Sequence, residues 1–482
     1  MINKKIIIQV MGLLLVIEGV FLGISTLVSL IYKQYDTQAL AITTLICIVF
    51  GGLLRVLTNK ADKNIGKREG YIIVSLVWIV FSLFGALPFV LSGAISSYTD
   101  AFFETISGFT TTGASILNDI ESIPYGLLFW RSLTQWLGGM GIIVLSIAIL
   151  PIFGIGGMQL FVAEVPGPTP DKLHPRIKET AKRLWVIYVL FTCAEVILLK
   201  LGGMNWFDAI NHSFTTMATG GYSTKQASIA HYDSPFIHYV ITLFMFIAGT
   251  NFTLSYFALH FKFGKVFKNE EFRYYLGFVL VFTFVIAFAL YHFNGIGLEQ
   301  SFRDSAFQVV SIITTTGFAT ADYLQWTPFV IVMIFALMFF GGSAGSTGGS
   351  VKIIRITLLL KNSYQELKRI IHPNAIIPVR MNGKSVPAPI ISNILAFVVI
   401  YMLITIVSTV LISALGYDLQ SSLGAVAATL GNIGPGIGKV GPVENYAHFP
   451  DIGKWFLSFL MLVGRLELFT VLILFSSAFW RK

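Results

Sequence analysis

Apolar residues fill long stretches of this chain, and short polar connections separate one stretch from the next. A helix needs roughly 20 mostly apolar residues to cross the hydrocarbon core of a membrane. The pattern predicts ten such spans, at residues 6–32, 39–57, 71–91, 125–153, 182–201, 235–261, 274–293, 327 to about 360, 389–415 and 451–480. Four shorter segments, each a half-length helix followed by a loop, lie between the paired spans at residues 100–115, 206–223, 299–320 and 419–436.

The four short segments are diverged copies of one another. In each segment the helix stops at a glycine, and these glycines are 108, 96 and 117 residues apart (221−113, 317−221, 434−317): Gly113, Gly221, Gly317 and Gly434. An aspartate stands thirteen residues before the first three glycines: Asp100, Asp208 and Asp304. The fourth copy has Ser421 there, and Asn432 where the others carry Thr111, Thr219 and Thr315. The chain therefore carries a long fourfold repeat.

A half-length helix that stops at a glycine is predicted to enter the membrane and leave by the same face. Irregular backbone at membrane depth is tolerated only when it is buried in protein or lines a water-filled path. Glycine permits a positive φ, and four such loops around one axis would present carbonyl oxygens to a dehydrated cation. The alternative is four loops that only pack inside a helix bundle. The fourfold recurrence favours a pore.

The predicted fold is an all-α polytopic membrane protein with four helix–pore loop–helix repeats around a pseudo-fourfold pore, preceded by a helical hairpin. The domains are expected at residues 1–69 (N-terminal transmembrane hairpin and basic cytoplasmic loop), 70–163, 164–262, 263–386 (with a broken second helix) and 387–482. Composition agrees with this class, because 55% of the residues are hydrophobic and 12% charged, with a mean hydropathy of +0.77. Cys47 and Cys193 lie in apolar spans and have no spacing typical of a metal site.

The charge distribution predicts an orientation. Basic residues concentrate in the connections at 55–68, 172–183, 262–273 and 361–384, so the net charge of +9 does not indicate a nucleic-acid partner. The positive-inside rule then places both termini in the cytoplasm and the four loops on the outer side. Acidic residues concentrate in the outer connections, where they would attract cations, although any single one could be ordinary loop charge.

Two features of the predicted spans suggest control of a pore. Residues 341–350 read GGSAGSTGGS and cannot form a regular lipid-facing helix, which predicts either a flexible gate or a close helix crossing. The candidate gate residues are Gly341, Gly342, Ser343, Ala344, Gly345, Ser346, Thr347, Gly348, Gly349 and Lys352. Arg465 lies inside the last span, where a charge is costly, and either faces the pore as a barrier or pairs with an acid such as Glu467.

Nucleotide and catalytic motifs are not supported. Gly436, Gly438 and Gly441 fit G-x-G-x-x-G but follow a pore loop and no predicted strand, so a dinucleotide site is excluded by its context. No pattern of catalytic residues stands out, and an enzyme is not expected. No cofactor is expected in this chain.

The motifs together resemble the Trk/Ktr/HKT superfamily of potassium transporters, specifically its bacterial TrkH/TrkG-type membrane subunit. The resemblance covers essentially the whole chain and rests on TTTGAS (110–115), QWLGGMG (135–141), ATGGYST (218–224), TTTGFAT (314–320), GGSAGSTGGSVK (341–352), GNIGPG (431–436) and GRLELF (464–469). It implies K⁺ as the transported and bound ion, a bacterial inner-membrane location, a homodimer within membrane lipid and a TrkA-type cytosolic nucleotide-binding regulatory subunit. Gly113 supports K⁺, because sodium-selective plant relatives carry serine at the matching position.

The resemblance also implies roles for individual residues. It assigns the gate to the broken span and the barrier to Arg465. The implied ion-binding filter consists of Thr110, Thr111, Thr112, Gly113, Ala218, Thr219, Gly220, Gly221, Thr314, Thr315, Thr316, Gly317, Gly431, Asn432, Ile433 and Gly434. The expected function is K⁺ uptake through a gated, channel-like filter. The alternatives are a proton- or sodium-coupled K⁺ symporter and a less selective K⁺/Na⁺ transporter.

Overall fold

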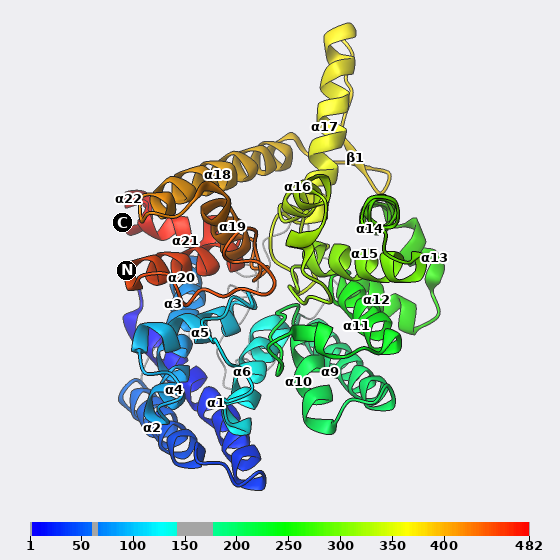
Figure 1. Ribbon diagram of the computed structural model, residues 1–482. Coiled ribbons are helices and arrows are strands. Elements are labelled where there is room, and N and C mark those ends of the chain that lie inside the picture. The colour runs from blue at the N-terminus through cyan, green and yellow to red at the C-terminus, as the bar shows by residue number, and fades with distance from the viewer. Residues whose placement is uncertain (1, 60–65, 142–176, 482) are drawn as a thin grey trace.

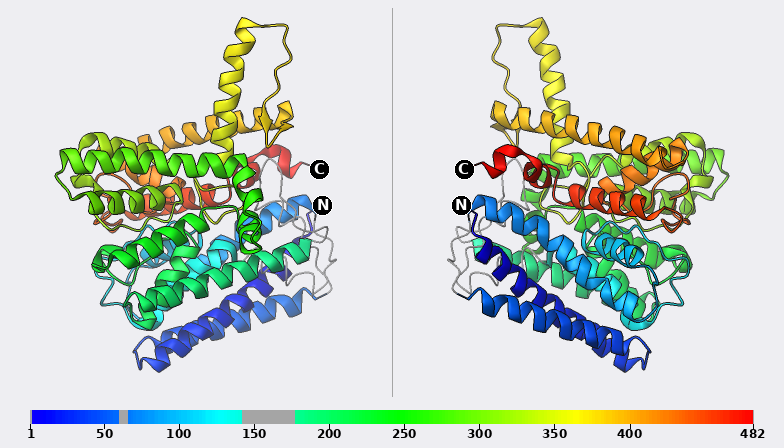
Figure 2. Two further views of the ribbon diagram at one scale, coloured as in Figure 1. Left: turned by 90° about the vertical axis from the view of Figure 1, so that its right-hand side faces the viewer. Right: turned by 90° about the vertical axis from the view of Figure 1, so that its left-hand side faces the viewer.

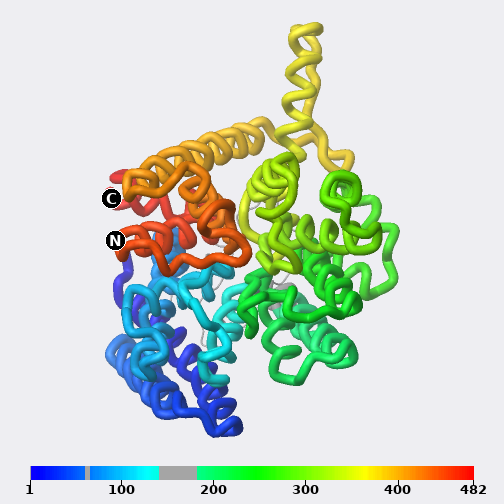
Figure 3. The backbone as a smooth tube through the Cα atoms, viewed as in Figure 1, coloured from blue at the N-terminus to red at the C-terminus, as the bar shows by residue number. Residues whose placement is uncertain are grey.

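The computed structural model describes residues 2–59, 66–141 and 177–481, and this part of the chain is mostly helical, with almost no strand. Figure 1 shows that the helical groups follow one another around the centre of the molecule in chain order, with the N-terminal hairpin at the periphery. The backbone trace in Figure 3 shows the loops of the four groups meeting near that centre. The two chain ends lie side by side (Figure 2). The all-α polytopic fold predicted from the sequence is confirmed.

The helical hairpin and the first two groups contain these elements: α1 (Lys4–Ile31), α2 (Thr37–Leu57), α3 (Lys67–Gly85), α4 (Leu87–Leu91), α5 (Tyr98–Phe109), α6 (Tyr125–Trp136), the π-helical turn η1 (Leu137–Gly141), α9 (Ile177–Leu201), α10 (Trp206–Met217), the 3₁₀ turn η3 (Ser228–His231), α11 (Pro235–Ala248) and α12 (Phe252–Leu259). The part of the span predicted at 125–153 that follows η1, and residues 172–176 of the basic connection at 172–183, lie outside the described residues.

The third and fourth groups contain the remaining elements: α13 (Phe263–Lys268), α14 (Glu270–Phe293), α15 (Leu298–Ile313), the 3₁₀ turn η4 (Tyr323–Gln325), α16 (Pro328–Leu337), α17 (Ile353–Ile371), the short hairpin β1 (Arg380–Met381) and β2 (Lys384–Ser385), α18 (Ala388–Ser413), α19 (Leu419–Leu430), α20 (Asp451–Arg465), α21 (Phe469–Leu472), the 3₁₀ turn η5 (Ile473–Phe475) and α22 (Ser477–Trp480). The two strands pair antiparallel.

Among the described residues, six helices are long and apolar enough to cross a membrane, or up to eight if each of two bent helix pairs is counted as one span. The protein is therefore a multi-pass membrane protein. The predicted total of ten spans and the predicted domain boundaries stay predictions.

Two spans predicted as continuous helices are broken instead. The span at 235–261 bends by 113° between α11 and α12, and the span at 451–480 bends by 111° after α20. At the first bend, the Asn251 side chain caps α12 by accepting a hydrogen bond from the amide of Thr253. At the second, Glu467 and Leu468 adopt positive φ values of 55° and 52°, which no α-helix can contain. An apolar window gives no information about either local event.

The span predicted at 327 to about 360 contains the expected break, but its end was placed wrongly. Helix α16 ends at Leu337 and helix α17 begins at Ile353, so the glycine-rich stretch lies between them. Helix α17 was predicted to end near Leu360, but it continues to Ile371 into the connection assigned to 361–384. The added turns contain good helix formers in KNSYQELKRII. This helix projects from the helical body (Figure 2).

Small residues bring the N-terminal hairpin close together. A Cβ atom added to Gly12 would lie 2.7 Å from the carbonyl oxygen of Gly51, and one added to Gly51 would lie 2.6 Å from that of Gly12. No ordinary side chain fits at such distances, so the two backbones are in direct contact. Membrane helices lack a hydrophobic driving force between them and commonly associate through such close packing.

Candidate functional site

Four short helices point into the centre of the molecule, and each carries one of the repeated loops at its C-terminal end. These pore helices are α5, α10, α15 and α19. Three begin with a side-chain cap: Ser97 accepts from the amide of Asp100, Asn205 from Asp208 and Asp418 from Ser421. Such caps satisfy backbone amides that have no partner within the helix.

Two of the three repeated aspartates lie at the start of their pore helix. Asp100 and Asp208 lie in the first turns of α5 and α10. Asp304 does not, because α15 has 16 residues against 12 in the other pore helices and begins at Leu298. Asp304 instead accepts a hydrogen bond from Thr320, just as Asp208 accepts one from Thr224. Both aspartates thus hold the part of their own loop that follows the repeated glycine.

The loop backbones repeat one unusual conformation four times. Four non-glycine residues have positive φ values of 52°, 54°, 60° and 53°: Thr111, Thr219, Thr315 and Asn432. Two residues later, φ is 82°, 75°, 80° and 96° at Gly113, Gly221, Gly317 and Gly434. A β-branched residue in the left-handed region is strained by about 1–3 kcal/mol and persists only where its surroundings impose it. Asn432 therefore takes the conformation of the three threonines, as its place in the repeat predicts.

One hydrogen bond closes each loop in the same way. The amide of the residue before the glycine donates to the carbonyl oxygen five residues earlier, and the distance is 2.8 Å in all four copies: Thr112 to Ser107, Gly220 to Thr215, Thr316 to Ser311 and Ile433 to Ala428. The divergent fourth loop is thus structurally equivalent to the others.

The four loops form a closed ring. A Cβ atom added to Gly113 would overlap the carbonyl oxygen of Gly220 on the second loop. The same contact recurs around the molecule. A Cβ atom added to the second, third or fourth loop glycine would meet a carbonyl oxygen of the next loop, in the pairs Gly221 and Thr316, Gly317 and Ile433, and Gly434 and Thr112. Each added atom would lie closer than 3.0 Å to an oxygen. The glycines are therefore required twice, by their φ values and by the backbone of the next loop.

The ring is lined by buried carbonyl groups that lack hydrogen-bond donors. The following residues are buried, and their carbonyl oxygens accept no hydrogen bond from the described part of the chain: Thr111, Thr112, Thr219, Thr315, Thr316, Asn432 and Ile433. Leaving a buried polar group unpaired costs about 1–3 kcal/mol, so a repeated set of such groups requires an explanation. A dehydrated cation satisfies carbonyl oxygens in this arrangement.

The electrostatics of the ring also favour a cation. The C-terminal ends of four helices meet there, and each carries roughly half a negative charge. Among the described residues, no group of three or more His, Cys, Asp or Glu side chains is placed to hold a metal ion. At the opposite end of α19, hydrogen bonds from the amide and hydroxyl of Ser421 lower the pKa of Asp418, so this helix start carries a carboxylate at neutral pH.

A cavity opens on the side of the ring where the loops return. All four repeated glycines line it, together with backbone and polar side chains that include Ser115, Ser223, Lys225 and Glu444. We call this space the mouth cavity. It has both acidic and basic residues along its wall.

The glycine-rich break lies on the other side of the ring, because it contacts residues that precede the glycines. The amide of Gly349 donates to the Thr315 hydroxyl at 2.7 Å, and the Thr347 hydroxyl donates to the carbonyl oxygen of Met217 at 3.1 Å. A Cβ atom on Gly349 would lie 2.6 Å from the carbonyl oxygen of Gly431. The candidate gate residues thus lie directly beneath the second, third and fourth loops. Lys352 donates back to the carbonyl oxygen of Gly348.

Arg465 joins this group of residues. Its guanidinium donates to the Thr111 hydroxyl at 3.0 Å, the Thr347 carbonyl oxygen at 2.7 Å and two carbonyl oxygens of the π-helical turn η1, at Gly138 and Gly139. Glu467, the acid named as its possible partner, forms an ion pair with Arg355. Arg465 therefore lies under the first loop, against the broken segment.

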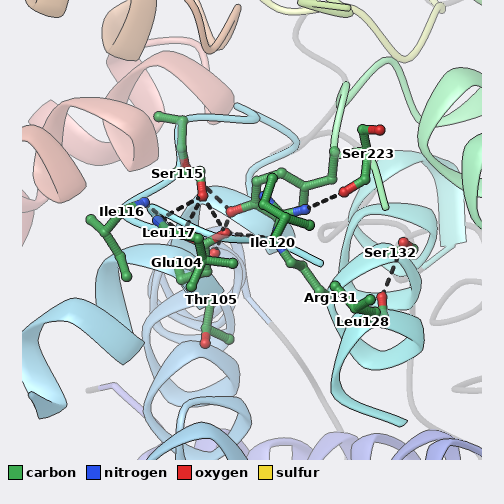
Figure 4. A network of polar contacts seen from close by, with 12 residues as sticks. Glu104, Thr105, Ser115, Ile116, Leu117, Ile120, Leu128, Arg131, Ser132 and Ser223 are labelled. Atoms are coloured by element: carbon green, nitrogen blue, oxygen red, sulfur yellow. Dashed lines mark hydrogen bonds and ion pairs between the residues drawn. The ribbon is translucent and has the colours of Figure 1, made fainter. Parts of the chain in front are cut away.

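Several residues that hold the loops were missed by sequence reasoning. Glu104 on α5 and Arg131 on α6 form a buried ion pair (Figure 4). Gln135 donates to the carbonyl oxygen of Gly220, and the Tyr446 hydroxyl donates to that of Gly434. A charge inside each of two apolar helices was the available indication for the ion pair. The tyrosine and the glutamine gave none, because their partners are 12 and 85 residues away.

A ring of unpaired carbonyl groups inside a bundle of apolar helices is typical of membrane proteins that transport cations. The model of the TrkH family, described as a cation transport protein, matches residues 36–482. The chain belongs to the TrkH family. The resemblance drawn from its motifs is confirmed.

Individual relatives agree over nearly their whole length. The Trk system potassium uptake protein TrkH of Escherichia coli (strain K12) is 43% identical over 482 residues, which cover 99% of each chain. The Trk system potassium uptake protein TrkG of the same strain is 36% identical over 458 residues, or 94% of each chain. The crystal structure of the potassium transporter TrkH from Vibrio parahaemolyticus superposes with a TM-score of 0.90 at 38% identity and covers both chains fully.

Proposed function

We propose that this protein takes up K⁺ across the bacterial inner membrane through the ring of four loops. The observation that carries the proposal is the closed ring of backbone contacts around buried, unpaired carbonyl oxygens. K⁺ is the ion named for the TrkH and TrkG relatives. Peptide oxygens replace the hydration shell of the ion as it passes.

The filter of this proposal consists of the sixteen loop residues named from the sequence, Thr110–Gly113, Ala218–Gly221, Thr314–Gly317 and Gly431–Gly434. The segment from Gly341 to Gly349, with Lys352, acts as the gate because it lies against the residues that precede the filter glycines. Arg465 adds a positive barrier at the same level. A cation leaving the filter meets both before it reaches the cytoplasm.

Orientation and partners belong to the same proposal. Both termini are cytoplasmic, and the mouth cavity faces outward, as the distribution of Lys and Arg residues indicates. The protein functions as a homodimer and is regulated by a TrkA-type cytosolic subunit that binds nucleotides. The names of the relatives, which refer to a Trk system, support an assembly with further components.

Electrical recording from the purified protein in planar lipid bilayers tests the function. We expect currents carried by K⁺ under voltage alone, with the same pH on both sides and without Na⁺, because 100 mV supplies about 2.3 kcal/mol per charge. Unitary currents far above carrier turnover support conduction. A strict requirement for H⁺ or Na⁺ as a co-ion contradicts it and favours a symporter.

A further inference from the structure

The ion pair between Glu104 and Arg131 connects two neighbouring filter loops. The Arg131 Nε atom lies 2.6 Å from Glu104 Oε1, and both side chains are almost completely buried, with exposed fractions of 3% and 0%. On one side, the Glu104 carboxylate accepts hydrogen bonds from the Ser115 hydroxyl at 3.0 Å and the Ile116 amide at 2.9 Å. These two residues follow Gly113 in the first loop.

On the other side, Arg131 holds the second loop. Its Nη1 atom donates to the carbonyl oxygen of Ser223 at 2.9 Å, and its guanidinium lies 3.5 Å above the centre of the Tyr222 ring. The Tyr222 hydroxyl returns to the first repeat and donates to the backbone oxygen of Glu104 at 2.6 Å. Tyr222 and Ser223 follow Gly221 directly. Figure 4 shows Glu104 between Ser115 and Arg131, with Arg131 reaching toward Ser223.

The other three loops have no carboxylate at the position of Glu104. Nine residues before the filter glycine, where the first loop has Glu104, the second, third and fourth have His212, Gln308 and Ala425 (221−9, 317−9, 434−9). His212 contacts the Ser223 hydroxyl at 2.9 Å, so the second loop keeps the same contact without an ion pair. The third and fourth loops are joined instead by the Tyr323 hydroxyl, which donates to the carbonyl oxygen of Gly436 at 2.7 Å.

We propose that Glu104 and Arg131 are positioning residues that fix the separation of the first and second filter loops and thereby contribute to K⁺/Na⁺ discrimination. The reason is geometric. The carbonyl oxygen of Gly220 is held between Gly113 and Gln135, so a shift of either loop moves a wall of the filter. A charge-assisted bond resists such a shift more strongly than a neutral bond does.

This inference rests on the proposed function and deepens it. Wild-type protein in proteoliposomes, assayed for K⁺ flux and for competition by Na⁺, tests that function first. If wild-type protein carries no K⁺, the proposed function fails and the role of the pair is a separate question. If it does, Glu104→Gln is compared with it, because glutamine keeps the volume but removes the charge. We expect the K⁺/Na⁺ ratio to fall about tenfold, because small displacements of liganding groups have large effects.

Three further variants separate positioning from folding. Arg131→Lys keeps the charge but replaces the guanidinium group, whose nitrogen atoms reach both Glu104 and Ser223, by a single ammonium group. We expect this variant to lower the K⁺/Na⁺ ratio as well. In the double variant E104Q/R131Q no buried charge is left unpaired, so we expect its melting temperature to recover toward wild type while its selectivity remains low. Glu299→Gln is the matched control, since it removes the charge of an exposed glutamate that pairs with Arg303 at the far end of a pore helix.

The outcomes decide the proposal. A lowered K⁺/Na⁺ ratio in E104Q and R131K, with the control unchanged, supports it. Wild-type selectivity in either folded variant overturns it. Recovery of selectivity together with thermal stability in the double variant also overturns it, because the pair would then serve stability alone.

Discussion

The guanidinium of Arg465 donates a hydrogen bond to the hydroxyl of Thr111, 3.0 Å away, and thus connects the last helix group to the first loop of the ring. Thr111 is one of the four residues held at positive φ. The same guanidinium contacts Thr347 in the broken segment. One side chain therefore touches both the filter of our proposal and its gate, and both are expected to respond when it is changed.

Removal of this charge is expected to increase ion flux. In Arg465→Ala, the positive barrier and the contact with Thr347 are lost together, so we predict a rise of about tenfold in K⁺ flux into proteoliposomes. Arg369→Ala, which breaks a surface ion pair with Glu366, is the matched control. If Arg465 is only structural, the variant will instead show lower thermal stability with unchanged or reduced flux per folded molecule.

Serine in place of Gly113 is expected to reduce ion discrimination. The new Cβ atom overlaps the carbonyl oxygen of Gly220, so the ring must widen at that point. We predict a fall of about tenfold in the K⁺/Na⁺ ratio, equivalent to about 1.4 kcal/mol. The measurement is Rb⁺ uptake in competition with Na⁺.

Gly93→Ser supplies the control for backbone strain. Gly93 has φ 76°, close to the 82° of Gly113, but an added Cβ atom there meets nothing within 4 Å. Gly93→Ser therefore introduces the strain of a left-handed residue without the steric overlap. Equal loss of selectivity in both variants would show that the contact between loops is irrelevant.

The sequence predicts the repeated unit well because its determinants are local. A short apolar helix and a glycine at fixed spacing define each loop, with a threonine two positions before the glycine in three of the four. Helix α10 (Trp206–Met217) begins where its segment was predicted to begin. The equivalence of Asn432 with Thr111 also follows from counting along the chain. The ring itself follows less directly, because contacts such as that between Gly434 and Thr112 join residues 322 positions apart (434−112).

The features that were missed depend on tertiary contacts. The bend at Glu467 occurs where this residue pairs with Arg355 on α17, and no apolar window reports such a partner. Helix α17 extends to Ile371 because the residues after Leu360 are good helix formers. Their positive charge alone had assigned them to a connection between spans. Glu104 and Arg131 lie 27 residues apart, on different helices, so the charge that each places in an apolar helix indicates a buried partner but not which residue that partner is.

Shortening the gate segment is expected to raise basal flux. Deletion of Ser346 to Gly348 removes the contact of Thr347 with Met217 and with Arg465, and shifts Gly349 away from Thr315. We predict at least about a fivefold increase in K⁺ flux without the regulatory partner, since an obstruction under the filter is withdrawn. Protein amount in the membrane and its melting temperature serve as controls. Unchanged or abolished flux in folded protein speaks against a gate in this segment.

The stability that the start of the fourth pore helix contributes to the protein is expected to depend weakly on pH. Hydrogen bonds from Ser421 lower the pKa of Asp418 in the folded state, so its contribution to stability is present above the pKa of the unfolded chain and is lost as pH falls through the folded pKa. Asp418 is exposed, so this contribution is at most about 1 kcal/mol. In Asp418→Asn the amide oxygen caps the same helix without titrating. We therefore expect the melting temperatures of wild type and D418N to be similar at pH 7 and the wild type to lose more stability toward pH 3. Parallel curves over this range would show that the carboxylate does not stabilise the helix start.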